Sequence, residues 1–143
     1  MDKESVKKNL ESVFKNETNV TFAFLFGSVA KNNLRYGSDI DVAIYFKNEP
    51  ALIEIGDLTL KIESALNCKL DLVRLNDLDK LNPVLAYNVI SEGIILINND
   101  KRVFNEFIKS VILRYLDFKP VNDFINKSFN KRLANNQFAV FDK

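Results

Sequence analysis

The sequence feature that most restricts the fold is a pair of short apolar runs that flank a polar segment in the first part of the chain. The first run covers residues 22–26 and the second covers residues 42–46. Both are rich in Phe, Val and Ile, and both are too short for an ordinary helix. We therefore predict two strands of one sheet, joined by a polar loop.

Two acidic residues mark the start of the second strand. Asp39 and Asp41 are two positions apart, so strand alternation places both side chains on the same face of the sheet. Carboxylates held side by side repel each other, and at least one takes up a proton unless a cation lies between them. Mg²⁺ binds one or two protein carboxylates and completes its coordination with water and phosphate oxygens. The pair is therefore a candidate metal site.

Gly27 and Ser28 directly follow the first strand. Gly permits a tight turn and close approach of a phosphate, and Ser28 is a candidate N-cap for a helical turn over residues 29–32. The free N–H groups of such a turn bind anions. Taken singly, Gly-Ser is typical of an ordinary turn and Asp-x-Asp of a solvated strand edge. Together, at this separation, they favour a site for a nucleoside triphosphate and its metal.

The composition excludes several kinds of chemistry. The chain of 143 residues has no His, which excludes Ser-His and Cys-His nucleophiles and His-ligated zinc. Its formal net charge is only +1, so it has no strong basic field for binding long nucleic acid. We expect neither a membrane span nor a signal peptide. The single Cys68 fits a reducing compartment, so we expect a cytoplasmic protein.

The rest of the chain predicts further helices and short strands, with a loop around Asn76 and Asp77. The expected helices cover residues 3–15, 51–67 and 83–91, a long segment from residue 100 that Pro120 breaks or kinks, and a last helix over 121–133. The expected further strands cover residues 69–75 and 94–97.

These elements predict an α+β fold with a small mixed sheet of about four strands flanked by helices. The buried stripe predicted for the second helix consists of Leu52, Ile55, Leu58, Ile62 and Leu66. We expect residues 1–143 to form a single domain, with C-terminal helices over about 100–133 and a short tail.

Two further charged residues have more than one interpretation. Asp71 lies among Leu and Val in the strand predicted over residues 69–75, where a carboxylate without a cation or a donor is costly to bury. It could also be an exposed strand residue or a partner of Arg74, although alternation places Arg74 on the opposite face. Arg35, in the polar loop, is either a phosphate ligand or a solvent-exposed side chain.

Gly-Ser and Asp-x-Asp at this spacing resemble the signature of the nucleotidyltransferase fold of the DNA polymerase beta superfamily. Over roughly residues 10–133, the chain is similar to the minimal nucleotidyltransferases, specifically the MntA antitoxins of HEPN/MNT toxin–antitoxin pairs. The segments that carry this similarity are GSVAKNNLRYGSDIDVAIYF, LDLVRLND, AYNVISEGIILINND and RYLDFKP. One departure is Lys31-Asn32, where relatives commonly have Arg-Gly. Lys31 keeps the charge but lacks the bidentate fork of Arg.

The resemblance implies protein AMPylation, in which AMP passes from ATP to a tyrosine hydroxyl of a HEPN ribonuclease toxin (HepT) and silences it. It also implies two Mg²⁺ ions. The residues that it assigns to catalysis and metal binding are Asp39, Asp41 and Asp71. The residues that it assigns to nucleotide binding are Gly27, Ser28, Lys31 and Arg35.

Two alternatives stay open. The chain could modify a small molecule such as an aminoglycoside, or an RNA end, although such relatives usually carry an additional helical domain for the acceptor. It could also be a catalytically idle antitoxin that neutralises its toxin by binding alone, since the departure at Lys31-Asn32 affects the phosphate loop.

Overall fold

The computed structural model describes residues 3–27 and 39–135 of the chain, with side chains as far as residue 118. Helices and strands follow one another much as the sequence predicts. In chain order they are α1 (Lys3–Phe14), β1 (Val20–Phe26), β2 (Ile40–Phe46), α2 (Leu52–Leu66), β3 (Leu70–Arg74), α3 (Leu78–Leu81), α4 (Pro83–Glu92), β4 (Ile94–Asn98) and α5 (Lys101–Asn135).

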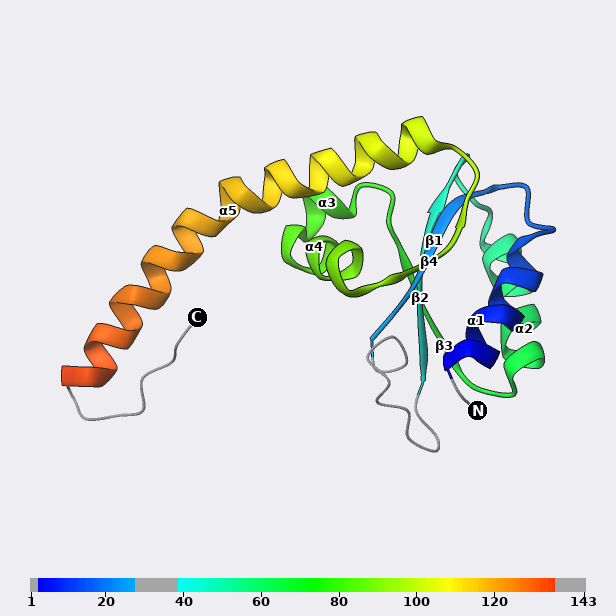
Figure 1. The fold of residues 1–143 in the computed structure, drawn as a ribbon, viewed down its shortest axis with the longest axis horizontal. Coiled ribbons are helices and arrows are strands. Elements are labelled where there is room, and N and C mark those ends of the chain that lie inside the picture. Colours follow the sequence, from blue (N-terminus) through cyan, green and yellow to red (C-terminus); the bar gives the residue numbers. More distant parts are fainter. Residues whose placement is uncertain (1–2, 28–38, 136–143) are drawn as a thin grey trace.

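The strands form one mixed sheet in the order β3-β2-β1-β4. β1 is antiparallel to both β2 and β4, whereas β2 and β3 are parallel. A parallel pair needs a crossover connection, and α2 supplies it. The α+β architecture with a small mixed sheet, predicted from the sequence, is confirmed (Figure 1).

Helices cover both faces of this sheet (Figure 1). α1 and α2 pack on one face, and α3, α4 and α5 pack on the other. Strand alternation divides β2 between the two cores, because Val42 and Ile44 join the core under α1 and α2, whereas Ala43 and Tyr45 join the other. A side chain at an odd-numbered position of β2 therefore lies on the side of α3, α4 and α5.

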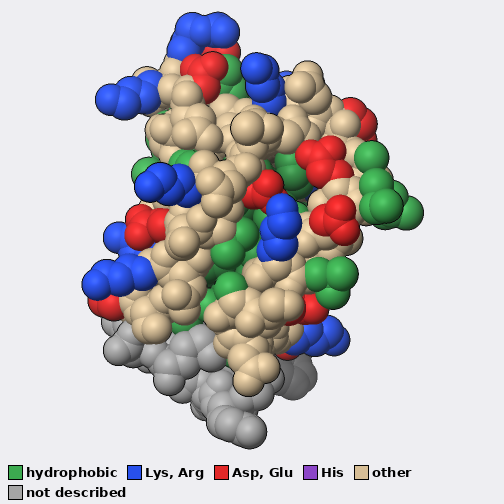
Figure 2. All heavy atoms as spheres, turned by 90° about the vertical axis from the view of Figure 1, so that its right-hand side faces the viewer, with side chains coloured by type: hydrophobic (Ala, Val, Ile, Leu, Met, Phe, Trp, Pro, Cys, Tyr) green, Lys and Arg blue, Asp and Glu red, His purple; other side chains and the backbone are tan. Residues whose placement is uncertain are grey.

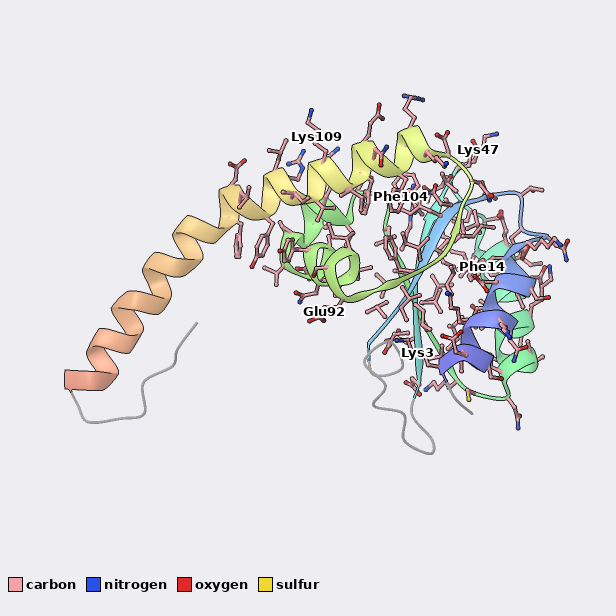
Figure 3. All side chains as sticks on the ribbon, in the orientation of Figure 1. Lys3, Phe14, Lys47, Glu92, Phe104 and Lys109 are labelled. Carbon is pink, nitrogen blue, oxygen red and sulfur yellow. The ribbon has the colours of Figure 1, made fainter. Side chains whose placement is uncertain are left out.

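Aromatic rings fill the core beneath α5. The ring of Phe22 in β1 stacks on Tyr45 with centroids 4.7 Å apart, and Phe104 of α5 lies edge-on to Phe22 at 5.1 Å. Such pairs stabilise a core beyond the area that they bury. Figure 3 shows Phe104 on the α5 side of the sheet and Phe14 of α1 on the other side. These contacts hold the first turns of α5 against the sheet.

α5 continues through Pro120, so the prediction of a separate last helix over residues 121–133 is wrong. Proline removes one backbone hydrogen bond from a helix, and this loss can kink the helix without ending it. Figure 1 shows that α5 bends along its length and that its second half extends away from the sheet.

Two smaller predictions also differ from the structure. The sequence predicts only a loop around Asn76 and Asp77, but α3 follows at once, and it is too short for helical periodicity to reveal it. Leu58, Ile62 and Leu66 are buried as predicted, but Leu52 is 86% exposed. Leu52 is the first residue of α2, so its inclusion in the buried stripe is wrong.

Candidate active site

Segments from three strands meet at one end of the sheet. Phe26, the last residue of β1, pairs with Asp41 of β2, and Asp41 pairs on its other side with Asp71 of β3. Gly27 follows β1 directly, and Asp39 directly precedes β2. The sheet therefore brings the predicted turn and the predicted acids to one place.

The parallel register explains why Asp41 and Asp71 are neighbours. Residues paired directly across adjacent strands point to the same face of a sheet. Ile40 and Leu70, one position earlier on each strand, pack in the core under α1 and α2, so both carboxylates lie on the opposite face. Arg74 is not the partner of Asp71, because its guanidinium pairs with Glu49.

The Asp41 carboxyl is electrostatically perturbed. Its pKa is raised from 3.8 to about 6, first by burial and then by the charge of Asp71, a hydrogen bond to the Asp71 side chain and the charge of Asp39. All of these effects disfavour a second negative charge at this point. A cation between the carboxylates removes the same penalty, and an oxygen-only pair fits Mg²⁺.

Within residues 3–27 and 39–118, no three His, Cys, Asp or Glu side chains are grouped so that they could enclose a metal ion by themselves. Mg²⁺ does not require such a cage, since it is commonly held by one or two carboxylates together with substrate phosphates. Asp39 is exposed, whereas Asp41 is half-buried beside Asp71. The Asp41–Asp71 pair is therefore the best-defined part of the candidate metal site.

Gly27 occupies a position that no other residue type could fill without displacing the site. Its φ is +78°, in the left-handed region that favours glycine. A Cβ built on Gly27 would lie 2.1 Å from Oδ2 of Asp41. The backbone of the turn therefore abuts the carboxylate, so a group that reached this backbone would also be next to Asp41.

The other nucleotide-binding residues that the sequence predicts lie outside the described residues. They are Ser28, Lys31 and Arg35.

Asn76 supports β2, and the sequence gives no sign of this role. Its Oδ1 accepts a hydrogen bond from the backbone N–H of Phe46 at 2.9 Å, and its Nδ2 donates to the carbonyl oxygen of Phe46 at 2.9 Å. The side chain thus acts as a strand partner where β3 has ended. An Asn in a turn is ordinary by composition, so only the fold distinguishes this one.

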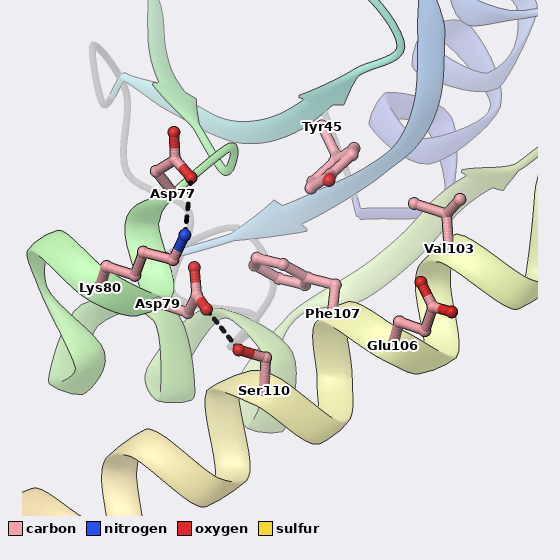
Figure 4. A pocket seen from close by; sticks show the side chains of 8 residues that line it. All are labelled: Tyr45, Asp77, Asp79, Lys80, Val103, Glu106, Phe107 and Ser110. Carbon is pink, nitrogen blue, oxygen red and sulfur yellow. Dashed lines mark hydrogen bonds and ion pairs between the residues drawn. The ribbon is translucent and has the colours of Figure 1, made fainter.

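A cavity of about 220 Å³ lies near the other end of β2, between α3 and α5 (Figure 4). Tyr45 lines it together with Asp79, which is only 6% exposed. Asp79 accepts hydrogen bonds from the Ser110 hydroxyl and from Nε of Arg114, the latter at 3.1 Å. These contacts satisfy the buried carboxylate and join α3 to α5, so we assign the cluster a structural role.

A family model described as "Polymerase beta, Nucleotidyltransferase" matches residues 8–102, which include every described strand and the acids Asp39, Asp41 and Asp71. The chain belongs to this family. The nucleotidyltransferase fold predicted from the motifs is thereby confirmed. None of the described helices of this nucleotidyltransferase is both long enough and apolar enough to cross a membrane.

The nucleotidyltransferase has a relative in Methanocaldococcus jannaschii, named "Putative protein adenylyltransferase MJ0435". The two are 28% identical over 72 residues, a match that covers 50% of this chain and 74% of the relative.

Solved toxin–antitoxin complexes contain chains with the same fold. A chain from a toxin–antitoxin structure with AMP-PNP matches with a TM-score of 0.68 and 23% identity, covering 86% of this chain and 97% of that one. A chain from an MntA–HepT complex matches with a TM-score of 0.63 and 22% identity, covering 88% and 97%. A third, from a Shewanella oneidensis complex of a tri-AMPylated HEPN toxin with an MNT antitoxin, has a TM-score of 0.64 and 22% identity, covering 89% and 98%. The resemblance to MNT antitoxins is confirmed at the level of the fold.

Proposed function

We propose that this nucleotidyltransferase transfers AMP from ATP to a tyrosine hydroxyl of a HEPN-family toxin and thereby neutralises the toxin. The observation that carries the proposal is the Asp41–Asp71 carboxylate pair beside the Gly27 turn. Two adjacent carboxylates can hold a metal ion, and the glycine backbone beside them allows the phosphates of a nucleotide to come close. The acceptor is supported by the likeness in fold to a complex whose HEPN toxin is AMPylated.

The carboxylates of Asp39, Asp41 and Asp71 would hold Mg²⁺. Magnesium, when bound, supplies positive charge that offsets the phosphates and lowers the pKa of a coordinated hydroxyl. The raised pKa of Asp41, about 6, supports this assignment, because a neighbouring cation would offset the burial and the like charges that raise it.

Side chains and backbone groups of this chain would then accept the tyrosine proton and align the tyrosine oxygen with the α-phosphorus of ATP. Asp71 would accept the proton of the tyrosine hydroxyl, whose ordinary pKa is about 10. The phenolate oxygen forms a bond to the α-phosphorus, the bond from that phosphorus to the oxygen bridging to the β-phosphate breaks, and pyrophosphate leaves. Gly27 and Ser28 would hold the β- and γ-phosphates in line with the attack, and Lys31 and Arg35 would offset the charge of the leaving pyrophosphate.

The test is the intact mass of a co-expressed HEPN-family protein after incubation with the chain, ATP and Mg²⁺. We expect the mass of that protein to rise by one or more AMP units. Asp41→Asn should abolish the shift, because it removes a ligand charge while keeping the side-chain shape. The matched control is Asp117→Asn, which changes an exposed aspartate on α5 outside the site and should leave the mass shift intact.

Three outcomes would contradict the proposal in different ways. A stable complex without any mass shift would indicate neutralisation by binding alone. Neither a complex nor a shift would favour a small-molecule or RNA acceptor. A shift that persists in Asp41→Asn would show that the carboxylate pair does not carry the transfer.

A further inference from the structure

A second cavity lies at the end of the sheet opposite the candidate metal site, where the starts of β1 and α5 meet the end of β2. Its volume is about 330 Å³, and we call it the β1–α5 cavity. Figure 3 places Lys47, the first residue after β2, beside the start of α5. The polar residues that line the cavity are Thr18, Thr21, Tyr45, Lys47, Asn99 and Asp100.

Thr21 brings a buried hydroxyl to this cavity. The residue is only 7% exposed, and its hydroxyl has no hydrogen-bond partner within residues 3–27 and 39–118. It lies where the register between β1 and β2 shifts, between the paired residues Val20 and Phe22. Shifts of this kind re-aim side chains and are common beside functional sites. A buried hydroxyl without a partner is costly, so its partner, water or a ligand, must lie in the cavity.

Three more donors line the same cavity without a partner in the described part of the chain. They are the hydroxyls of Thr18 and Tyr45 and the ammonium group of Lys47. The pKa of Tyr45 is raised, first by burial and then by the charges of Asp77 and Asp79, so its phenol keeps the proton and can donate it. One cation and three hydroxyls suit a phosphate group, whose oxygens accept hydrogen bonds.

The wall at the start of α5 offers acceptors instead. Oδ1 of Asp100 accepts hydrogen bonds from the backbone N–H groups of Arg102 and Val103, each at 3.1 Å, which leaves Oδ2 for another donor. Nδ2 of Asn99 donates to the carbonyl oxygen of Val20 at 2.9 Å, which leaves Oδ1 of Asn99 as an acceptor. Such oxygens bind hydroxyl groups, and the charge of Asp100 disfavours a phosphate on this wall.

We propose that the β1–α5 cavity binds the phosphate monoester of a small polyol, as in a sugar phosphate. The phosphate would lie beside Lys47 and Thr21, and the hydroxyl groups of the ligand beside Asn99 and Asp100. A volume of about 330 Å³ is at the lower end of the range for ligand sites, about 300–1,000 Å³, and suits a ligand of this size.

The surface charge around this end of the molecule favours an anionic ligand. Figure 2 shows basic side chains standing out at its upper end, where Figure 1 places the start of α5. A local excess of positive charge raises the concentration of anions near the surface. The cavity is thus suited to attract a phosphate as well as to bind it.

NMR titration of the isotope-labelled chain with ribose 5-phosphate, in EDTA, tests the proposal. We expect the amide resonances of Thr21, Lys47 and Asn99 to shift and to saturate, with a Kd on the order of 1 mM. Ribose and inorganic phosphate should each bind at least about tenfold more weakly, because each makes only half of the contacts. No saturable shift at these residues overturns the proposal, and equal binding of inorganic phosphate overturns its polyol part.

A pair of lysine variants tests the phosphate contact. Lys47→Gln should weaken the binding of ribose 5-phosphate at least about tenfold, because it removes the cation from the cavity. The matched control is Lys109→Gln, which makes the same charge change at an exposed position on α5 outside the cavity and should leave the Kd unchanged (Figure 3). Equal weakening in both variants would show that only net charge matters and would overturn the site.

Thr21→Val tests the buried hydroxyl, since valine keeps the branched shape of threonine. The variant should bind ribose 5-phosphate about tenfold more weakly, through the loss of one hydrogen bond to a charged group. Its Tm without ligand should be unchanged or higher, because the hydroxyl has no partner to lose within the described residues. A lower Tm or an unchanged Kd overturns the role of Thr21. These measurements use neither ATP nor a toxin, so their failure is separate from failure of the proposed function.

Discussion

Replacing Asp41 by Asn should stabilise the metal-free protein at neutral pH. In the folded chain the pKa of Asp41 is raised from 3.8 to about 6, chiefly by burial and by the charge of Asp71. Between these two values the folded state keeps a proton that the unfolded state has released, so stability falls as pH rises. The contribution of this group is therefore fully present below about pH 4 and is lost above about pH 6.

The size of the effect follows from the shift. The rise in the pKa of Asp41 from 3.8 to about 6 lowers the free energy of unfolding by at most about 3 kcal/mol at neutral pH. Asp41 is half-buried, so solvent screens part of this energy, and we expect about 1–2 kcal/mol. For a domain of this size the gain amounts to about 3–8 °C in Tm. Asn keeps the shape of the side chain without its charge, so Asp41→Asn should show most of this gain.

Differential scanning calorimetry in EDTA, at about pH 4 and at about pH 7.5, measures the difference in Tm between Asp41→Asn and the native chain. The gain in Tm of Asp41→Asn over the native chain should be small at the lower pH and full at the higher. Mg²⁺ should raise the Tm of the native chain at pH 7.5 and should hardly change that of the variant. Asp117→Asn, an exposed control, should match the native chain throughout. A variant less stable than the native chain at pH 7.5, or an equal gain at both pH values, would refute the reasoning.

Three substitutions test the scaffold around the site. Gly27→Ala should lower the free energy of unfolding by about 1–3 kcal/mol and reduce the proposed AMP transfer, because the left-handed φ is strained for alanine and the Cβ displaces the Asp41 carboxylate. An unchanged Tm and an unchanged transfer rate would contradict this. Asn76→Ala should lower the free energy of unfolding by about 2 kcal/mol in urea titration, since it leaves two backbone groups of Phe46 without their partner. Asp79→Ala should lower the free energy of unfolding by about 2–3 kcal/mol in the same titration, because it breaks the hydrogen bonds that join α3 to α5. Replacing the exposed Asp77 by Ala should lower it by less than about 1 kcal/mol.

The elements that could be predicted from the sequence are those marked by local sequence patterns. The strands around Gly27 and Asp41 are short β-rich runs with a turn signal between them, so their existence follows from the sequence. The family motif adds the order of the remaining elements. The direct pairing of Asp41 with Asp71 is a register between distant strands, and only the sheet places the two residues opposite each other.

The mispredicted parts depend on contacts that no local pattern encodes. Helical periodicity treats Leu52 like Leu58, but Leu52 begins α2 and is left exposed. Proline is an ordinary stop signal, yet α5 continues through Pro120. The sequence makes no prediction for Asp79, whose buried carboxylate accepts hydrogen bonds from Ser110 and Arg114, more than 30 positions along the chain. Such a pair has no sequence signature.

The parallel pairing of β2 with β3 also determines when a working site can form. The antiparallel pair β1–β2 closes over one loop, whereas β3 reaches β2 only after the whole of α2 has crossed the sheet. The Asp41–Asp71 pairing therefore closes a longer loop than the β1–β2 pairing does, and the mutual repulsion of the two acids opposes this closure in the absence of a cation. A partly folded chain can carry the Gly27 turn and Asp41 and still lack the acid pair. The candidate metal site therefore depends on the β2–β3 register, and a chain in which β3 has not paired with β2 does not have this site.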